Sequence, residues 1–372
     1  MTKIFMVSGG SGGHLFPAYA LAEEMGKRMG SLRIMLAISG KPEEGGIIEY
    51  IKDKLKNLKI YIVPVLPLNK KGGFFYWFIF LSHFIIGSIY SFLLILFLHP
   101  SIVVGFGGLL SLPLIFSAFL LRIPTLVHEQ NLYPGKANRL LYYFAEKVAL
   151  SFEESKFYFK NKNKLVITGN PLRPDLKIRD KKESLKKLGL NPSSFTVLIL
   201  GGSQGASSLN RYFTSLWENW KRENGGIQVI HITGLKDWDW VSRRYRDIDI
   251  PARLFPFCEE MGIVYSAADL IISRAGASTL NELSFFAKPT IVIPYPYAEQ
   301  HQFHNAFYYL QRGGVLLLEE RDLFKENTQD FIRNIIRDRD KQSLLSREIK
   351  KLNNPSSAKL LADLVEEILN IN

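Results

Sequence analysis

Two glycine-rich segments, one near the start of the chain and one past its middle, constrain its fold more than any other feature. The first, Gly9 to Gly13, directly follows an apolar run at Ile4 to Val7 that is typical of a buried strand. The second, Gly201 to Gly205, follows a similar run at Thr196 to Leu200 and shares several of its letters. A glycine loop between a strand and a helix lets backbone N–H groups approach an anion without interference from Cβ atoms. The shared context predicts two phosphate-cradling units, one in each half of the chain.

Apolar strand-like runs and helical stretches alternate after each glycine loop. In the first half, further strands are expected at Arg33 to Ile38, Ile60 to Val63, Ser101 to Val104 and Pro124 to Val127. In the second half, they are expected at Gln228 to Ile232, Asp269 to Ser273 and Thr290 to Ile293. The first loop should open a helix that runs to about Met29, with Pro17 in its first turn. This alternation predicts an α/β protein with doubly wound parallel sheets.

The boundary between two domains is marked by a change in composition near the middle of the chain. Turn-forming residues crowd the segment from Val166 to Pro174, and a strongly charged segment from Lys177 to Lys187 follows it. A length of 372 residues fits two domains of ordinary size. We therefore expect a first Rossmann-like domain at 1–168 and a second at 169–349, with a C-terminal helix at about 350–372 that packs back on the first.

The charge balance of the chain favours an anionic partner. Lys and Arg together outnumber Asp and Glu by 47 to 35, which gives a formal net charge of +12. Nucleic acid, anionic lipid and phosphorylated substrate all meet that requirement, but the chain has no arginine-rich arm, zinc-finger spacing or RNA-binding motif. Nucleic acid is therefore the weakest of the three.

The single cysteine, Cys258, excludes an internal disulfide and fits a reducing compartment. The first residues pass from a short apolar strand straight into glycines, without the long apolar core of a signal peptide. Export is therefore not expected.

A long uncharged run at Phe74 to Leu98 raises the question of a membrane. It contains no Asp, Glu, Lys or Arg and is long enough to span a bilayer. If it did, the strands before and after it would emerge on opposite sides, and the first sheet could not close. Gly87 and several serines dilute the run, and Lys70 and Lys71 precede it, as in interfacial helices with a basic flank. We expect a crossover helix whose outer face enters the membrane interface; an ordinary buried helix and a true span are the alternatives.

Neither glycine loop matches a dinucleotide-cofactor or NTPase pattern. Leu15 occupies the position of the last glycine in the pattern G-x-G-x-x-G, so a nicotinamide cofactor is not supported. The second loop lacks the lysine of a P-loop, although Ser203 can donate a hydrogen bond to a phosphate oxygen. A tight strand-to-helix turn without a ligand is the alternative for the first loop. One loop in each half predicts a cleft between the two domains, with helix N-termini aimed into it.

Two polar segments follow strands, and one arginine in the hinge is a further candidate for ligand binding. Ser273 to Glu282 begins at a strand end and enters a helix near Ala277, where Glu282 either accepts both hydroxyls of a ribose or only complements the helix dipole. His128 to Asn131 follows a strand, at the edge where open α/β sheets bind ligands, or it forms an Asx-type turn. Arg173, in a proline-rich hinge, either clamps a phosphate or lies on the surface.

Together these motifs resemble those of one family, the MurG N-acetylglucosaminyltransferases, which have the GT-B fold and invert the configuration at the transferred sugar. That family adds N-acetylglucosamine from UDP-GlcNAc to the lipid-linked muramyl-pentapeptide precursor of peptidoglycan. The resemblance covers nearly the whole chain. It rests on segments that occur in the family's order: Gly9 to Pro17, Gly105 to Gly108, His128 to Asn131, Gly169 to Arg173, Gly201 to Ala206, Ser273 to Glu282 and Gln302 to Ala306.

The resemblance implies a set of site residues. His14 resembles the proposed general base, with Glu129 as the rival candidate. Donor contacts fall on Ser11, Gly12, Gly13, Asn131, Arg173, Ser203, Gln204, Cys258, Ala277, Ser278, Thr279, Leu280, Asn281, Glu282 and Gln302. Among them, Cys258 would lie near the uracil and use its backbone. The acceptor diphosphate is assigned to Gly105, Gly107 and Gly108.

Two departures from the family's pattern fall in these loops. After Gly108 the family commonly shows an aromatic residue and later a glycine, where this chain has Leu109 and Leu112. In the later loop, Ala275 replaces a usual serine. The acceptor site is therefore supported by fewer matching residues than the donor site.

The reaction that the resemblance implies moves N-acetylglucosamine from UDP-GlcNAc to the C4 hydroxyl of the muramyl residue of lipid I, which gives lipid II. It implies no cofactor and no obligatory metal, because helix N-termini, Ser203 and Arg173 can stabilise the leaving diphosphate. Three alternatives stay open: a transferase that glycosylates diacylglycerol or a sterol, a UDP-GlcNAc 2-epimerase, and a non-catalytic membrane scaffold for cell-wall enzymes.

The expected partners follow from that reaction. They are UDP-GlcNAc, the lipid-linked muramyl-pentapeptide acceptor, an anionic membrane surface and other cell-wall synthesis proteins, but no nucleic acid. The expected location is the cytoplasmic face of the cell membrane, where the protein would be peripheral.

Overall fold

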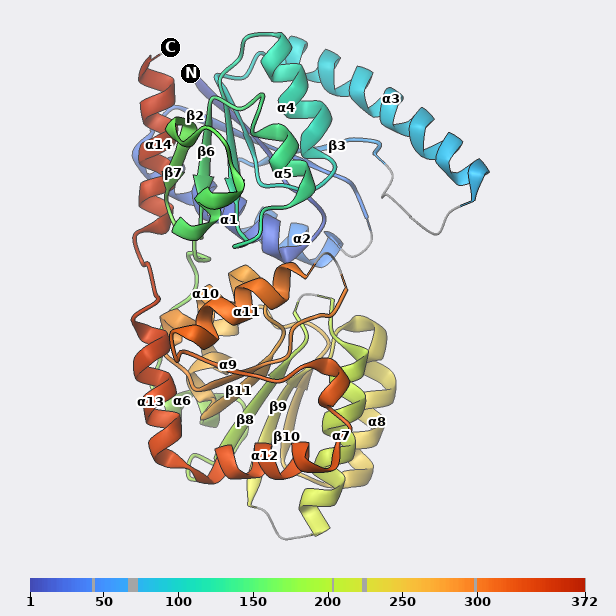
Figure 1. Cartoon of the computed structure of the whole chain (residues 1–372), viewed down its shortest axis with the longest axis vertical. Helices are drawn as coiled ribbons and strands as arrows, with labels where there is room; N and C mark the ends of the chain where they lie inside the picture. The colour runs from blue at the N-terminus through green and yellow to red at the C-terminus, as the bar shows by residue number, and fades with distance from the viewer. Residues whose placement is uncertain (42–43, 66–72, 203, 223–225, 298–299, 372) are drawn as a thin grey trace. The chain divides into compact units, whose positions relative to one another are not determined.

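The chain divides into two compact units, each built on one parallel sheet. The computed structural model describes residues 1–41, 44–65, 73–202, 204–222, 226–297 and 300–371. The first unit holds residues 1–174 and 355–372, and the second holds residues 175–354. Helices cover both faces of each sheet (Figure 1). The predicted fold class, two doubly wound Rossmann-like α/β domains, is confirmed.

The sheet of the first unit has seven parallel strands in the order β3-β2-β1-β4-β5-β6-β7. They are β1 (Thr2–Val7), β2 (Leu32–Ile38), β3 (Lys59–Ile62), β4 (Ile102–Gly105), β5 (Thr125–Glu129), β6 (Lys147–Leu150) and β7 (Leu165–Ile167). The order reverses direction between β1 and β4, which pair directly with Val7 opposite Gly105. This reversal is the switch point of the sheet, and its carboxyl edge is where such folds bind ligands.

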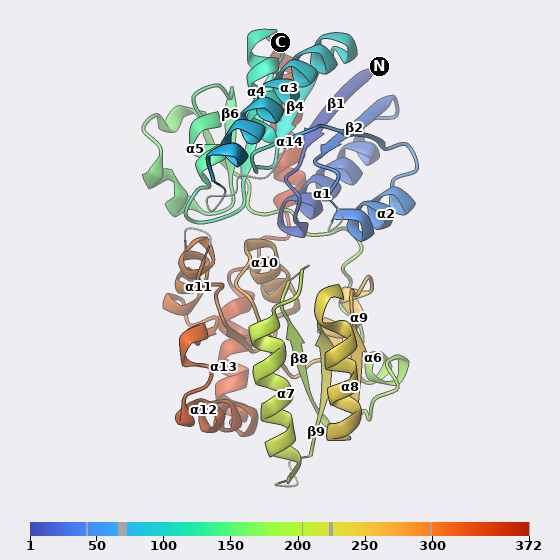
Figure 2. The same ribbon diagram turned by 90° about the vertical axis from the view of Figure 1, so that its right-hand side faces the viewer.

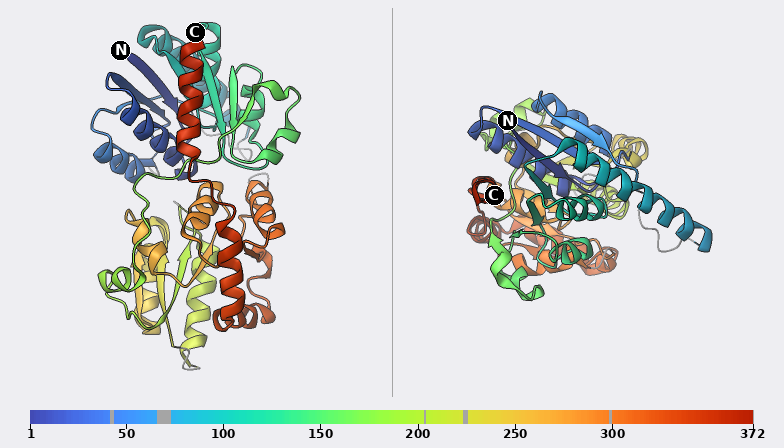
Figure 3. Two further views of the ribbon diagram at one scale, coloured as in Figure 1. Left: turned by 90° about the vertical axis from the view of Figure 1, so that its left-hand side faces the viewer. Right: turned by 90° about the horizontal axis from the view of Figure 1, so that it is seen from above.

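The helices of the first unit lie on two faces of the sheet. They are α1 (Gly12–Arg28), α2 (Gly45–Lys54), α3 (Phe74–Leu98), α4 (Ser111–Leu120), α5 (Lys136–Leu141) and α14 (Ser357–Ile371), with 3-10 segments at Glu153–Tyr158 and Lys162–Lys164. The C-terminal α14 lies beside α1 (Figure 3, left), where Arg28 pairs with Asp363 at 2.6 Å and with Glu366 at 3.1 Å. The last helix of the chain thus completes the first unit.

The core between the sheet and α3 and α4 follows from the alternation of side chains along each strand. Phe5 and Val7 of β1 point to this face and pack in one cluster with Ile95 of α3 and Leu114 of α4. All four side chains are fully buried. Because both faces of a parallel sheet are covered, its strands are apolar along most of their length, as the runs in the sequence suggested, and charged residues such as Lys3, Arg33 and Lys59 lie near their amino ends.

The sheet of the second unit has six parallel strands in the order β10-β9-β8-β11-β12-β13, with its switch point between β8 and β11. The strands are β8 (Phe195–Leu200), β9 (Ile227–Ile232), β10 (Ala252–Phe255), β11 (Leu270–Ser273), β12 (Thr290–Val292) and β13 (Leu316–Leu317). Short 3-10 segments lie at Leu235–Asp237 and Glu320–Asp322.

Helices again cover both faces of this second sheet (Figure 2). They are α6 (Lys181–Lys187), α7 (Ser207–Arg222), α8 (Trp238–Ile248), α9 (Met261–Ala267), α10 (Ala277–Phe286), α11 (His301–Gln311), α12 (Glu326–Arg337) and α13 (Arg339–Lys350). Phe213 and Trp217 of α7 pack in one cluster with Ile199 of β8 and Ile332 of α12, so α7 and α12 share a face. Both aromatic side chains are fully buried.

The start of α1 and the division of the chain differ from the sequence-based expectation. The glycine loop itself closes the first turn of α1, since the N–H groups of His14 and Leu15 both donate to the carbonyl of Ser11. Pro17 therefore lies in the second turn of α1, and its expected place in the first turn is wrong. The second unit begins at Asp175, six residues after the expected Gly169, because the turn-rich hinge packs with the first unit.

The uncharged run forms one helix, α3, with an exposed surface that is almost entirely apolar. Its buried residues are Gly87, Ser91 and Ile95, one narrow stripe at intervals of four residues. A Cβ at Gly87 would come within 2.8 Å of Val65, so glycine allows the helix to approach the segment after β3. The alternative of an ordinary buried helix is wrong. The basic flank at Lys70 and Lys71 lies outside the described residues.

Candidate functional site

The sequence motifs gather at the two switch points. In the first unit, the glycine loop at 9–13 follows β1 and the glycine segment at 105–108 follows β4. In the second unit, the glycine loop at 201–205 follows β8 and the polar segment at 273–282 follows β11. Each motif thus lies at the carboxyl end of a strand beside a reversal of strand order, where open α/β sheets bind ligands. Each unit therefore holds its own candidate ligand-binding region.

The two glycine segments of the first unit are in direct backbone contact. The N–H of Gly9 donates to the carbonyl of Gly107 at 3.1 Å. A Cβ on Gly108 would lie 2.9 Å from the Cα of Gly9, and Gly108 has φ +83°. A side chain at Gly108 would thus be both strained and blocked. Glycine is needed here for the close packing of the two loops.

The remaining residues of the first loop open α1. Ser11 takes the N-cap position with an extended backbone, and Gly12 and Gly13 begin the helix. The first N–H groups of a helix have no partner within the helix, and they favour an anion. The loop can therefore hold a phosphate. A tight strand-to-helix turn without a ligand, the alternative for this loop, would have the same backbone conformation.

A chain of hydrogen bonds links His14 to the interior of the first unit. His14 Nδ1 lies 3.0 Å from Oε1 of Gln130. The amide nitrogen of Gln130 lies 3.0 Å from the carbonyl of Phe106 and 3.0 Å from Nδ1 of His128. His128 Nε2 in turn lies 3.0 Å from the carbonyl of Gly169. Sequence reasoning placed His14 in the site but gave no role to Gln130.

This chain determines which ring nitrogens carry hydrogen. A carbonyl oxygen only accepts, so His128 donates from Nε2 to Gly169, and Gln130 must present its nitrogen to Phe106. Gln130 Oε1 then faces His14 and accepts from Nδ1–H, which leaves the lone pair of His14 on Nε2. Burial lowers the pKa of His128 to about 4, so that side chain stays neutral at neutral pH. His14 is thereby held in the tautomer that a general base requires.

The carboxylate of Glu129 is enclosed by donors. Oε1 accepts from the backbone and side-chain nitrogens of Asn131 at 2.8 and 3.1 Å. Oε2 accepts from the Gly135 N–H at 2.9 Å and from the Asn138 side chain at 2.8 Å. Glu129 is 1% exposed, and four donors contact its two oxygens. The geometry suits a carboxylate that shapes the loop after β5 better than one that takes a substrate proton.

Asn138 is a residue of this region to which sequence reasoning gave no role. Its side-chain nitrogen donates to the His128 carbonyl at 3.2 Å as well as to Glu129. A Cβ on Gly107 would lie 3.3 Å from that nitrogen and 3.2 Å from the His14 ring. Asn138 therefore lies beside the glycine segment and His14. In the sequence, only the position of Asn138, about one helical turn after Pro134, indicates that it belongs to this region.

Arg173 lies inside the first unit. Its guanidinium stacks 4.4 Å from the centre of the Phe16 ring and 5.2 Å from that of Tyr50, and it donates to the Tyr50 hydroxyl at 3.3 Å. Arg173 is 4% exposed, so the alternative of a plain surface arginine is wrong. The aromatic rings hold its charge close to α1, which begins at the first glycine loop.

The second glycine loop packs on the connection after β9. Gly205 has φ +75°, and a Cβ there would collide with the Thr233 carbonyl. Asn210 of α7 donates to that same carbonyl at 2.8 Å, and its Oδ1 lies 2.9 Å from Nε2 of the buried His231. These contacts hold the loop in place. Gln204 is exposed at its tip, whereas Ser203 lies outside the described residues.

The helix after β11 offers its N-terminus to a ligand. Gly276 is its N-cap, and Ala277, Ser278 and Thr279 form its first turn. Leu280 differs from these, because its side chain is fully buried and its N–H donates to Gly276. The geometry therefore favours donor contacts at the first three positions of the helix over the fourth, Leu280.

Glu282 lies in the second turn of α10, since the first turn holds no acidic residue. The alternative of a first-turn glutamate that serves only the helix dipole is therefore wrong. The hydroxyl of Tyr265 donates to Oε2 of Glu282 at 2.7 Å, and Glu282 is 8% exposed. Tyr265 orients the carboxylate, and Asn281, its neighbour in the helix, is similarly buried.

Gln302 ties two connections of the second unit together. Its Oε1 accepts from the N–H of Ala275 at 3.2 Å and from the N–H of Tyr295 at 3.0 Å. The fully buried Asn305, four residues after His301 in α11, donates to the Ala275 carbonyl at 3.4 Å. Ala275 is thus anchored through its backbone N–H and carbonyl. These contacts do not need the hydroxyl of the serine that is usual at this position.

Cys258 lies buried in the connection between β10 and α9, at the same carboxyl edge of the sheet. Burial in that connection is compatible with the expected backbone contact. Among the described residues, no three His, Cys, Asp or Glu side chains are grouped so as to hold a metal ion.

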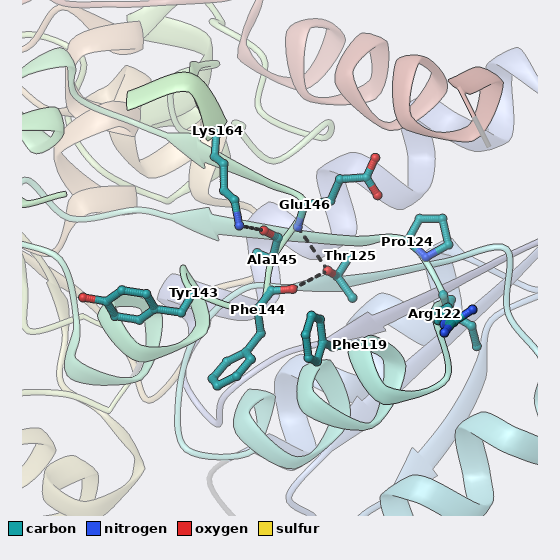
Figure 4. A pocket seen from close by; sticks show the side chains of 10 residues that line it. Phe119, Arg122, Pro124, Thr125, Tyr143, Phe144, Ala145, Glu146 and Lys164 are labelled. Carbon is teal, nitrogen blue, oxygen red and sulfur yellow. Dashed lines mark hydrogen bonds between the residues drawn. The ribbon is translucent and has the colours of Figure 1, made fainter. Parts of the chain in front are cut away.

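A pocket of about 300 Å³ occurs at the opposite edge of the first sheet (Figure 4). It is lined by residues before β5 and β6, including Arg122, Phe144 and Glu146. Lys164 donates to the Ala145 carbonyl at 2.9 Å, so its charge serves the local backbone. This pocket lies at the amino ends of the strands, away from the switch point, and it is not the candidate site.

Both halves of the chain match known domain families. Residues 4–150 match the glycosyltransferase family 28 N-terminal domain, and residues 196–363 match the glycosyltransferase family 28 C-terminal domain. A curated protein of Halothermothrix orenii, UDP-N-acetylglucosamine–N-acetylmuramyl-(pentapeptide) pyrophosphoryl-undecaprenol N-acetylglucosamine transferase, is 32% identical over 98% of this chain and 98% of its own length. The likeness to that protein therefore extends from end to end.

Solved structures share the fold. The crystal structure of MurG from Acinetobacter baumannii has a TM-score of 0.74 at 22% identity, and the match covers 99% of this chain and 100% of that one. UDP-GlcNAc 2-epimerase from Neisseria meningitidis, bound to UDP-GlcNAc, has a TM-score of 0.69 at 16% identity over 98% of this chain and 100% of that one. The fold alone therefore does not separate a transferase from an epimerase.

Proposed function

The chain belongs to glycosyltransferase family 28, and on that premise we propose that it moves N-acetylglucosamine from UDP-GlcNAc to the C4 hydroxyl of the muramyl residue of a lipid-linked muramyl-pentapeptide. The curated relative that matches from end to end carries this donor and this acceptor in its name. The protein is a UDP-GlcNAc-dependent glycosyltransferase of peptidoglycan synthesis. Inversion at the anomeric carbon follows from a single in-line attack.

The observation that carries the proposal is the orientation of His14 beside Gly107. The ring donates from Nδ1 to Gln130, so its Nε2 has the lone pair for a hydroxyl proton. A base of this kind must come within about 3 Å of the attacking hydroxyl. A histidine in this tautomer at the carboxyl edge of a Rossmann sheet supports base catalysis at neutral pH. Glu129 supports the reaction by shaping the loop that carries Gln130 and Asn131.

The donor is assigned to the second unit together with residues of the first. The helix start at Ala277 to Thr279 and the second glycine loop would bind the diphosphate through N–H groups. Glu282, oriented by Tyr265, would accept the ribose hydroxyls. Negative charge grows on the UDP leaving group, and these dipoles with Arg173 would stabilise it. Ser11 to Gly13, Asn131, Gln204, Cys258 and Gln302 complete the proposed donor contacts.

The acceptor is assigned to the first unit. The backbone at Gly105 to Gly108 lies at the switch point, and helix α4, which begins three residues after Gly108, has an N-terminal dipole that would favour the acceptor diphosphate. The exposed apolar face of α3 supports a peripheral position at the cytoplasmic face of the membrane, next to a lipid-linked substrate. Both ends of α3 connect to strands of one sheet, which argues against a span.

The alternatives are less well supported. An epimerase needs no lipid acceptor, so the exposed apolar face of the 25-residue helix α3 argues against it. A transferase for diacylglycerol or a sterol would also act at a membrane. The name of the curated relative, however, states a muramyl-pentapeptide acceptor. A scaffold would not need His14 held in one tautomer.

The test is a transfer assay with the full chain in detergent. Labelled UDP-GlcNAc is incubated with the lipid-linked muramyl-pentapeptide, with diacylglycerol, with a sterol or with no acceptor, and lipid products and free sugars are separated. We expect labelled disaccharide lipid and released UDP only with the muramyl acceptor. Transfer to diacylglycerol or the sterol, or formation of N-acetylmannosamine without acceptor, would overturn the proposal.

A further inference from the structure

A groove of about 280 Å³ lies between α3 and α4, which run side by side on one face of the first sheet (Figures 1 and 2). Large apolar side chains form its walls: Ile89, Phe92 and Leu93 of α3, and Phe116 and Leu120 of α4. The smaller Ser88, Pro113 and Ser117 also line it, and Pro113 and Ser117 are buried at its base. Neither helix contains a charged residue.

The serines widen the groove without making it polar. Ser88 donates its hydroxyl to the Phe84 carbonyl at 2.7 Å, and Ser117 donates to the Pro113 carbonyl at 2.6 Å. Each hydroxyl is therefore satisfied within its own helix. A ligand in this groove need not offer any hydrogen bond, and a polar ligand would lose its hydration.

The size of the groove restricts the occupant further. An α-helix with its side chains is about 10–12 Å across, so a helix of another protein could rest over the groove but not enter it. A volume of about 280 Å³ is at the lower limit of small-molecule pockets. A slender apolar chain is the shape that fits.

The position of the groove connects it to the acceptor site. Helix α4 begins three residues after Gly108, and the Ser111 hydroxyl donates to the Gly107 carbonyl at 2.8 Å. Pro113, at one end of the groove, lies in the first turn of α4. The apolar groove thus starts in the first turn of the helix that follows the glycine segment, which we assign to the acceptor diphosphate.

We propose that this groove binds the isoprenoid units nearest to the diphosphate of the lipid-linked acceptor. The inference rests on the proposed function, from which it takes the lipid. The diphosphate end lies at the first turn of α4, the chain runs along α4 toward Leu120, and its remainder leaves over the exposed face of α3. The enzyme then recognises the acceptor's lipid by contact, and not only through a shared membrane.

The first test uses the unaltered full chain without vesicles or micelles. Two soluble acceptors are compared: muramyl-pentapeptide linked through a diphosphate to a geranyl group, and the same compound with a methyl group. We expect the KM for the geranyl acceptor to be lower by about tenfold, the effect of burying roughly two methylene groups. Equal KM values for the two acceptors would overturn the inference. Absence of transfer to both would instead count against the proposed function.

The second test fills the groove. Ser88→Phe should raise the KM for the geranyl acceptor about tenfold and leave the KM for the methyl acceptor and for UDP-GlcNAc unchanged. Ile86→Phe, on the exposed face of the same helix and outside the groove, is the matched control and should change none of them. Binding of both variants to anionic vesicles should equal that of the unaltered chain.

The outcomes separate the acceptor's lipid from bulk lipid. If Ser88→Phe weakens vesicle binding and leaves both acceptor KM values unchanged, the groove serves membrane lipid and the inference is wrong. An equal rise in KM for both acceptors would show a general distortion of the site and would also overturn it. Because the first test needs no variant, poor folding of Ser88→Phe would not leave the inference undecided.

Discussion

The imidazole of His14 and the amide of Gln130 form a hydrogen bond of 3.0 Å between Nδ1 and Oε1, although 116 positions separate them in the chain. Gln130 cannot turn its amide over, because its nitrogen donates to the Phe106 carbonyl on the other side. The bond therefore selects one tautomer of His14 and directs its basic nitrogen away from Gln130. Catalysis by His14 should depend on both residues.

Removal of His14 should chiefly reduce turnover. We expect His14→Ala to lower kcat by about 10²–10⁴-fold, the usual contribution of a general base, with the KM for UDP-GlcNAc within a few fold. Gln130→Leu should lower kcat in the same direction by about tenfold, because the tautomer is no longer selected. Steady-state kinetics checks both. Unchanged turnover in His14→Ala would refute its role as base.

Substitution of Glu282 should act on donor affinity. Glu282→Ala removes the proposed acceptor of the ribose hydroxyls, so the KM for UDP-GlcNAc should rise about tenfold to a hundredfold. Tyr265→Phe, which keeps the carboxylate but removes its 2.7 Å hydrogen bond, should raise it less. Titration with UDP gives the same comparison without turnover. A fall in kcat alone would contradict the ribose assignment.

The second glycine loop offers a matched pair of positions. Gly205 and Gly202 both have positive φ, but a Cβ would collide with Thr233 only at Gly205 and would meet open space at Gly202. Gly202→Ala should cost about 1 kcal/mol of stability, and Gly205→Ala should cost more than that. Thermal unfolding of the two variants measures the difference. Equal losses would mean that backbone strain, and not packing on Thr233, requires the glycine.

Stability should fall as the pH is lowered below neutrality. Burial lowers the pKa of His128 to about 4 and that of His231 to about 3, while an unfolded histidine titrates near 6.5. The unfolded chain therefore binds these protons first. The stabilisation is complete above about pH 6.5 and is progressively lost as the pH falls toward 4.

Urea unfolding at a series of pH values tests this linkage. Between pH 7 and 5 the midpoint should fall, and it should fall less steeply in His231→Gln, which removes one of the two titrating rings. A midpoint in His231→Gln that falls as steeply as in the unaltered chain would argue against the contribution of His231.

Membrane association should depend on the exposed face of α3. Ile85 is half exposed on this helix, and Ile85→Asp should weaken binding to anionic vesicles by at least tenfold, because a charge is costly in the interface. Ile178→Asp, at an exposed apolar position of the second unit, is the control and should bind like the unaltered chain. Co-sedimentation with vesicles measures both. Equal binding of all three proteins would place the contact elsewhere.

Most strands and the start of α10 at Ala277 were predictable, because each is a local pattern. Apolar runs such as Thr196 to Leu200 were predicted to within a residue or two of their observed ends. Strands β6, β7, β10 and β13 were missed, since they are short and lie at or next to a sheet edge, where the apolar pattern is weak. Pro17 was misplaced because a glycine loop that also forms a helical turn leaves no separate signal in the sequence.

The candidate site was only partly predictable. The motifs named His14, Glu129, Arg173 and Glu282, but not the partners that give them their geometry. Arg173 between two aromatic rings looks no different in sequence from a surface arginine. Gln130 and Tyr265 were missed as positioning residues because nothing near them in the chain shows what they touch.

The sequence by itself determined the alternation of strands and helices, the glycine loops after the strands and the apolar run of α3. These depend on side-chain periodicity and on backbone conformation, which are properties of neighbouring residues. Tertiary structure alone decided that Gly9 meets Gly107, that Gln130 selects the tautomer of His14, and that α3 and α4 leave a groove. Such contacts depend on which strands lie beside one another at each switch point, and no local pattern specifies that order.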